Sequence, residues 1–68
     1  MQTSDLGLAL KVNRIMKRRL ARHIAASADL SASRLSDIEN GYIQPTPEQV
    51  SRICAALGIT PADLEHAV

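Results

Sequence analysis

With 68 residues the chain amounts to one domain at most, and its single cysteine rules out an intramolecular disulfide. A hydrophobic fraction of 46% is typical of a folded domain, no apolar stretch reaches the ~20 residues that span a bilayer, and the single aromatic residue disfavours binding of single-stranded nucleic acid by ring stacking. The net charge of +1 hides an uneven distribution, because six of the eight basic residues lie between Lys11 and Arg22 with no acid among them.

Helix-forming residues dominate and no alternation of period two points to strands, so the sequence predicts an all-α fold of five short helices. The first helix is expected over about 5–18 and the second over about 20–28. Ser31 is a good cap for the third, over 32–40, and Gly41 ends it because glycine accepts the left-handed conformation at no steric cost.

The last two helices carry the clearest start signals. Thr46 can cap a fourth helix over 47–57, where the side chain of Gln49 can close a capping box. A second cap-then-proline pattern opens a fifth helix over 61–67, in which Leu64 is expected to face inward.

The connection between the second and third helices is only about three residues long, from Asp29 to Ser31. A turn this short makes the two helices cross steeply, as in a DNA-binding helix-turn-helix. The opposite face of the third helix carries short or polar residues that need no burial. The positions expected to face inward are apolar, with a small residue where the two backbones approach: Ile24, Ala25, Leu30, Leu35 and Ile38.

This pattern resembles the phage repressor and Cro family, also called XRE-like helix-turn-helix regulators, over nearly the whole chain from about Leu6 to Leu64. The most specific matches are Ile38-Glu39-Asn40-Gly41 at the end of the third helix and Ala56-Leu57-Gly58-Ile59-Thr60 between the fourth and fifth. The resemblance implies a compact, five-helix, lambda-repressor-like DNA-binding domain whose third helix enters the major groove.

The resemblance also implies roles for individual residues. The residues at the start of the third helix and one turn later are expected to contact base edges. The serine hydroxyls and the arginine guanidinium of the same helix can also hydrogen-bond to bases. The base-reading candidates are Ala32, Ser33, Arg34, Ser36 and Asp37. The end of that helix and the loop after it are expected to contact phosphate, at Asn40, Tyr42 and Gln44. The family often pairs an arginine of the first helix with the glutamate that ends the third, here Arg14 and Glu39; the alternative is two separate surface charges.

Two departures from the family pattern bear on these roles. Ala21 stands where the family usually has a glutamine that clamps a phosphate, so this contact is expected to move to a nearby arginine: Arg18, Arg19 or Arg22. Asp29 stands where the turn usually has glycine, and aspartate tolerates the left-handed conformation better than most residues.

The basic block from Lys11 to Arg22 has two possible meanings. It is typical of a surface that binds a polyanion, most often nucleic acid, or it is a solvated helix face that keeps a small protein soluble. No serine or cysteine nucleophile lies near His23 in a known catalytic spacing. Cys54 lies among apolar residues and is expected to be a core or interface residue; the alternative is a redox sensor. One cysteine and two histidines do not make a recognisable zinc-ligand set, so the sequence predicts neither an enzyme nor a cofactor or metal site.

Together these features predict a cytoplasmic transcription regulator with no membrane association, a repressor that binds a palindromic operator in double-stranded DNA as a homodimer with half-sites ~34 Å apart. The alternative is an antitoxin, or another interaction module, that binds DNA together with a partner protein such as a toxin. As in related repressors, the dimer interface is expected between the loop after the third helix and the last helix, at Ile43, Leu64, Ala67 and Val68. The competing surface is the surplus apolar face of the first helix, at Leu8, Val12 and Ile15.

Overall fold

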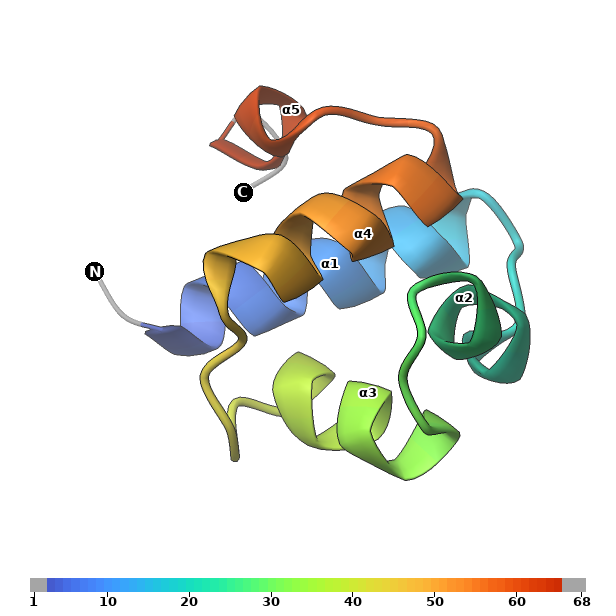
Figure 1. Cartoon of the computed structure of the whole chain (residues 1–68). Coiled ribbons are helices and arrows are strands. Elements are labelled where there is room, and N and C mark those ends of the chain that lie inside the picture. Colours follow the sequence, from blue (N-terminus) through green and yellow to red (C-terminus); the bar gives the residue numbers. More distant parts are fainter. Residues whose placement is uncertain (1–2, 66–68) are drawn as a thin grey trace.

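The computed structural model describes the backbone of residues 3–65 and the side chains of residues 6–64. Its helices are, in chain order, α1 (Thr3–Met16), α2 (Ala21–Ser27), α3 (Ala32–Glu39), α4 (Pro47–Leu57) and α5 (Pro61–Glu65), as Figure 1 shows. The predicted all-α fold of five helices is confirmed, and residues 3–65 contain no strand. The first helix begins before residue 5 and ends before residue 18, whereas residues 66 and 67 of the expected fifth helix lie outside the described residues.

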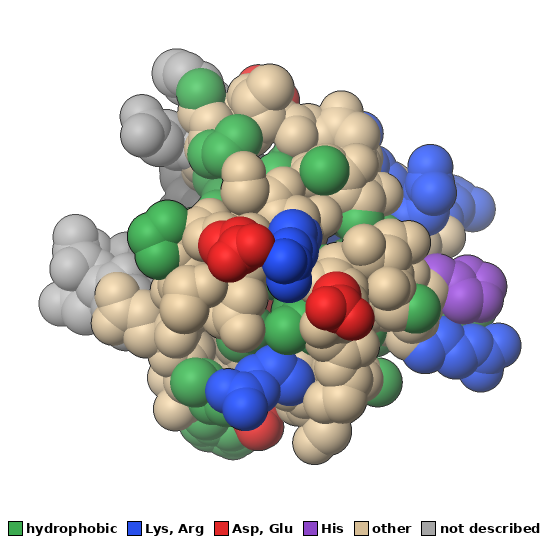
Figure 2. All heavy atoms as spheres, viewed as in Figure 1, with side chains coloured by type: hydrophobic (Ala, Val, Ile, Leu, Met, Phe, Trp, Pro, Cys, Tyr) green, Lys and Arg blue, Asp and Glu red, His purple; other side chains and the backbone are tan. Residues whose placement is uncertain are grey.

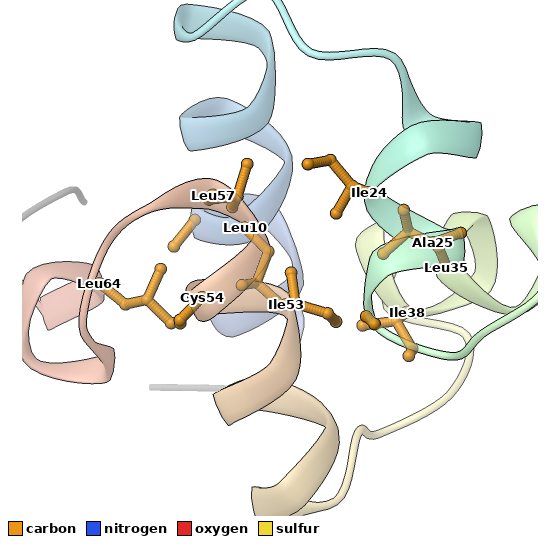
Figure 3. Packing of buried hydrophobic residues seen from close by; sticks show 11 residues of the cluster. Leu10, Ile24, Ala25, Leu35, Ile38, Ile53, Cys54, Leu57 and Leu64 are labelled. Carbon is orange, nitrogen blue, oxygen red and sulfur yellow. The ribbon is translucent and has the colours of Figure 1, made fainter.

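α1 and α4 lie side by side, with α2 and α3 on one side of this pair and α5 on the other (Figure 1). The apolar positions expected to join the second and third helices are buried or, for Leu30, half-buried against the core. Aliphatic side chains from all five helices meet between them (Figure 3); the buried apolar residues are Ala9, Leu10, Ile24, Ala25, Ala28, Leu35, Ile38, Ile53, Cys54, Leu57 and Leu64.

Four successive helices end in the same hydrogen-bonded reversal, in which one residue after the helix adopts a left-handed conformation. After α2, the amide of Leu30 donates to the carbonyl of Ala25 at 2.8 Å and the amide of Asp29 donates to that of Ala26 at 3.2 Å. The same pair of bonds follows α1, α3 and α4, so the chain turns back each time within a few residues. The left-handed residues are Arg18 (φ 55°), Asp29 (φ 62°), Gly41 (φ 81°) and Gly58 (φ 77°).

Replacing Asp29 with glycine should stabilise the protein by about 0.5–1 kcal/mol. A left-handed non-glycine residue costs ~1–2 kcal/mol, which the greater freedom of glycine in the unfolded chain offsets only in part. The contact that would be lost is weak, because Asp29 Oδ2 lies 3.9 Å from Arg52 Nη1 and the aspartate side chain is 90% exposed. Urea unfolding measures the change. Asp29→Ala is the control, since it removes the charge but leaves a side chain in the left-handed conformation; a glycine variant no more stable than the alanine variant would contradict this account.

Candidate nucleic-acid interface

α2, the turn after it and α3 form the helix-turn-helix unit. The Oγ of Ser31 accepts a hydrogen bond from the amide of Arg34 at 3.0 Å, so Ser31 caps α3 as the sequence predicted. Leu35 and Ile38 are buried in the core, which turns the opposite side of α3 outward. In Figure 1, α3 lies at one edge of the molecule with this side free of other helices.

The outward side of α3 carries most of the residues expected to read bases. Asp37 differs, because its side chain is half-buried and its backbone carbonyl accepts hydrogen bonds from the amides of Tyr42 and Ile43 at 2.9 and 3.3 Å. Asn40, the expected phosphate contact, is exposed and its Nδ2 donates to Ser36 Oγ at 3.4 Å. The exposed base-reading candidates are Ala32, Ser33, Arg34 and Ser36.

The loop after α3 alternates between outward and inward side chains. Tyr42 is 78% exposed and Gln44 is also exposed, as expected of phosphate contacts. Ile43 is half-buried against the core and Pro45 is buried, so these two residues hold the loop on the domain. The loop therefore presents its polar groups beside the end of α3.

A basic surface surrounds the turn from α1 to α2. Figure 2 shows lysine and arginine side chains gathered at the right of the molecule, where Figure 1 places that turn and α2. Ala21 is half-buried against the core, and the N-cap residue of α2, Leu20, makes no capping hydrogen bond through its side chain. Neither Leu20 nor Ala21 can therefore offer a polar contact at the start of α2, whereas four exposed basic residues lie around it and form the basic surface: Lys17, Arg18, Arg19 and Arg22.

The remaining arginine of the basic block has a structural role. Arg14 Nε donates to Glu39 Oε2 at 2.8 Å, Nη2 donates to Oε1 at 3.1 Å, and Nη1 donates to the backbone carbonyl of Arg19 at 3.0 Å. Glu39 is 7% exposed, and its side chain raises the pKa of Arg14 by accepting these hydrogen bonds. The structure thus brings together the two residues that the resemblance paired, and it ties α1 to the end of α3 and to the start of the basic surface.

Gly7 provides a second contact between α1 and α3, which the sequence reasoning missed. A Cβ atom at this position would overlap the carbonyl oxygen of Ile38 and would lie 3.1 Å from that of Glu39. Any larger residue must therefore push α1 away from α3. The signal was available, since an isolated glycine inside a helical pattern often marks a close packing contact.

The expected dimer interface on the last helix needs a correction. Leu64 is only 5% exposed and belongs to the hydrophobic core, where Figure 3 shows it beside Cys54, so it has no free surface to offer a second copy. Leu64 faces inward, as the sequence predicted for the fifth helix, because α5 folds back onto both α1 and α4. Ile43 is half-buried, and Ala67 and Val68 lie outside the described residues.

The described part of the chain contains no cluster of metal-binding side chains. No three His, Cys, Asp or Glu residues lie close enough there to hold a metal ion. Cys54 is buried, and burial and then the charge of Asp63 raise the pKa of its thiol, which keeps it protonated and poorly nucleophilic. None of the described helices is long and apolar enough to cross a membrane.

Comparisons with known proteins agree with this geometry. The helix-turn-helix family model matches residues 15–64. Two crystal structures of the clp gene regulator ClgR from Corynebacterium glutamicum are similar to this chain, each with 31% sequence identity. Both matches cover 96% of this chain; they cover 84% of the ClgR chain in one structure and 69% in the other, with TM-scores of 0.91 and 0.92. No curated protein matches. The match over most of the chain and the shared fold show that the protein belongs to the XRE-like helix-turn-helix family of DNA-binding proteins.

Proposed function

We propose that the protein is a transcriptional repressor that binds a palindromic operator as a homodimer and blocks polymerase there. The observation that carries this proposal is the free outer side of α3, which continues into a polar loop, together with the basic surface at the start of α2, the other helix of the helix-turn-helix unit. The similarity to a regulator of clp genes supports a role in gene control.

In this proposal α3 enters the major groove and reads the operator weakly through base edges. The methyl group of Ala32 offers contact only to thymine, and the hydroxyls of Ser33 and Ser36 accept or donate without strong preference. Arg34 is exposed at the start of α3, and its guanidinium can donate two hydrogen bonds to the edge of a guanine. Asp37 is half-buried, and DNA phosphates close to it would repel its negative charge. We therefore expect sequence-dependent DNA shape to supply part of the specificity.

Phosphate contacts in this proposal flank α3 on two sides. Arg18, Arg19 and Arg22 replace the glutamine clamp that Ala21 cannot provide, and the exposed residues after α3 hold the neighbouring stretch of backbone. The latter are Asn40, Tyr42 and Gln44.

Neutralising the basic surface should make DNA binding less sensitive to salt. Each phosphate contact releases ~0.9 counterion, so Arg19→Gln and Arg22→Gln should each reduce the slope of log K against log salt by about one unit. Arg52→Gln is the matched control: it removes the same charge from α4, where Arg52 pairs with Glu48 at 2.6 Å, and should leave the slope nearly unchanged. Fluorescence anisotropy at several salt concentrations gives the slopes. Equal slopes in all three variants would mean that the basic surface is a solvated face.

Selection of bound sequences from random duplexes, with the isolated protein, tests the rest of the proposal. A palindromic consensus is the expected result. If the isolated protein enriches no sequence, but does so once a partner protein is added, the result would instead favour an antitoxin-like module.

A further inference from the structure

The backbone of Arg19 is held on both sides by a single residue of α1. The amide of Arg19 donates to the backbone carbonyl of Arg14 at 3.0 Å, and the carbonyl of Arg19 accepts from Arg14 Nη1, also at 3.0 Å. Arg19 lies in the connection between α1 and α2, outside both helices, and its exposed side chain belongs to the basic surface. Arg14 therefore fixes the point from which the Arg19 side chain extends.

The residue before Arg19 makes this support important. Arg18 has a φ of 55°, a left-handed conformation that is unfavourable for a residue with a side chain. Such a conformation persists only where the surrounding contacts hold it in place. The two bonds between Arg14 and Arg19 supply part of this hold, together with the bond from the amide of Arg18 to the carbonyl of Ile15 at 2.9 Å. Loss of the side-chain bond should therefore loosen the backbone at Arg19.

The same guanidinium is also bonded to the end of α3. Arg14 Nε and Nη2 donate to the two carboxylate oxygens of Glu39, and the next residue, Asn40, is the C-cap of α3 and an expected phosphate contact. One side chain, only 16% exposed, thus connects the end of α3 with the basic surface. Phosphates are regularly spaced along the DNA backbone, so two phosphate contacts form together only if the protein holds them at a matching separation.

We propose that Arg14 is a positioning residue for DNA binding: it fixes Arg19 relative to the end of α3, so that Arg19 and Asn40 meet two phosphates at once. This proposal rests on the proposed function, in which both residues contact phosphate. Arg14 itself needs no contact with DNA. Among the described residues its side chain hydrogen-bonds only to Glu39 and Arg19, so a contact made by Arg22, which lies within α2, should not depend on it.

Arg14→Lys is the variant that separates the two roles of the guanidinium. Glu39 and Arg19 bond to different nitrogens of Arg14, whereas a lysine ammonium is a single point on a flexible stem. The ammonium should pair with the charged carboxylate of Glu39 and leave the carbonyl of Arg19 without its donor. The substitution keeps the net charge, so a change in salt dependence cannot come from a charge lost at position 14.

A double-mutant cycle on DNA affinity tests the proposal. Fluorescence anisotropy at several salt concentrations gives the affinities of the wild type, Arg14→Lys, Arg19→Gln and the double variant for a duplex that the wild type enriches from random sequences. Arg19→Gln should reduce the slope of log K against log salt by about one unit in the wild type, but by about half a unit or less in Arg14→Lys. The factor by which Arg19→Gln weakens binding should be at least about threefold smaller in Arg14→Lys.

Arg22→Gln is the matched control, because it removes the same charge from a residue that Arg14 does not hold. Its effect on affinity should agree within about twofold between the wild type and Arg14→Lys, as expected of independent sites. An effect of Arg19→Gln that is equal in the two backgrounds would overturn the proposal. So would equal reductions for Arg19→Gln and Arg22→Gln, since these would show a general loosening of the domain. If the wild type enriches and binds no duplex, the proposed function itself is wrong.

Circular-dichroism melting curves should show that Arg14→Lys folds. If it does not fold, Arg14→Leu/Glu39→Leu takes its place in the cycle, because it removes both charges of the pair together, keeps the net charge and also removes the bond to Arg19. The same expected results and the same contradicting results then apply to this background.

Amide hydrogen exchange, measured by NMR without DNA, tests the hold on Arg19 separately. In Arg14→Lys the amide of Arg19 should exchange about threefold faster or more, relative to the amide of Gly58, as expected for the loss of one hydrogen bond. Gly58 is the internal reference because its amide lies in the equivalent reversal after α4, where it donates to the carbonyl of Ala55 at 3.1 Å. An unchanged ratio of the two rates would show that the Arg14 side chain does not hold Arg19, whatever the result with DNA.

Discussion

Replacing Arg14 with leucine should lower the free energy of unfolding by about 3–5 kcal/mol, as expected when one partner of a buried ion pair is removed. The substitution would leave the carboxylate of Glu39, which is only 7% exposed, without the two hydrogen bonds that it accepts at 2.8 and 3.1 Å. The cost comes mainly from the buried charge that remains, more than from the attraction that is lost. Urea unfolding of the two proteins measures the difference.

Removing both charges separates these two contributions. An Arg14→Leu/Glu39→Leu double variant should recover a large part of the stability, because neither charge then remains buried alone. Arg52→Leu is the control for a surface pair: Arg52 and Glu48 lie 2.6 Å apart, but their side chains are 45% and 73% exposed, so the loss should stay below ~1 kcal/mol. Equal losses for Arg14→Leu and Arg52→Leu would show that burial of Glu39 has no energetic consequence.

The contribution of Arg14 should not change with pH near neutrality. Glu39 raises the pKa of Arg14, chiefly through the hydrogen bonds. A basic group whose pKa is raised by folding contributes stability that is complete below its unfolded pKa and is lost only as the pH rises through its folded pKa. Both values lie far above neutral pH for arginine, so the titration of Arg14 should not change the free energy of unfolding of the wild type, measured in urea, between pH 6 and pH 8.

Replacing Leu64 with alanine should destabilise the protein by about 2–5 kcal/mol, the usual cost of a cavity in a packed core. Leu64 is 5% exposed and is the residue through which α5 enters the core. A chain of this size has a total stability of only about 3–10 kcal/mol, so a substantial share would be lost. Thermal unfolding at several protein concentrations measures the effect.

The same experiment separates a core role for Leu64 from a dimer role. A core residue lowers stability equally at every protein concentration, whereas an interface residue would leave the folded monomer intact and weaken pairing alone. Leu20→Ala is the control, because Leu20 is 52% exposed and its truncation should change stability by less than ~0.5 kcal/mol. If the Leu64→Ala protein is as stable as the Leu20→Ala protein, Leu64 is not a core residue.

Features that depend on local sequence could be predicted well. The capping box is an example: Thr46 Oγ1 accepts from the amide of Gln49 at 3.1 Å, and Gln49 Oε1 accepts from the amide of Thr46 at 2.9 Å. Ser31 and Gly41 mark the two ends of α3 for similarly local reasons. The inward positions of the helix-turn-helix followed from helical spacing and a short turn, which leave few ways to pack two helices.

Features that depend on distant packing were harder to predict. Leu64 lies on a helix of five residues, whose sequence alone cannot reveal that it covers α1 and α4. Arg18 adopts a left-handed conformation although nothing in its residue type favours it, because the hydrogen bonds after α1 hold it there. The roles of α3 in reading bases remain predictions, since they depend on how DNA is seated on the protein.

The repeated reversals after α1 to α4 determine where the chain can change in length. Three of the connections turn on a single left-handed residue whose neighbours bond back to the helix just completed, so an added residue there would break both bonds and rotate the next helix. The connection from α3 to α4 is different. Tyr42 and Ile43 are anchored to α3 and Thr46 to α4, which leaves exposed Gln44 between two fixed points. Insertions and deletions among homologues should therefore collect at this position, where extra length can alter the loop after α3 while the packing of the helices stays the same.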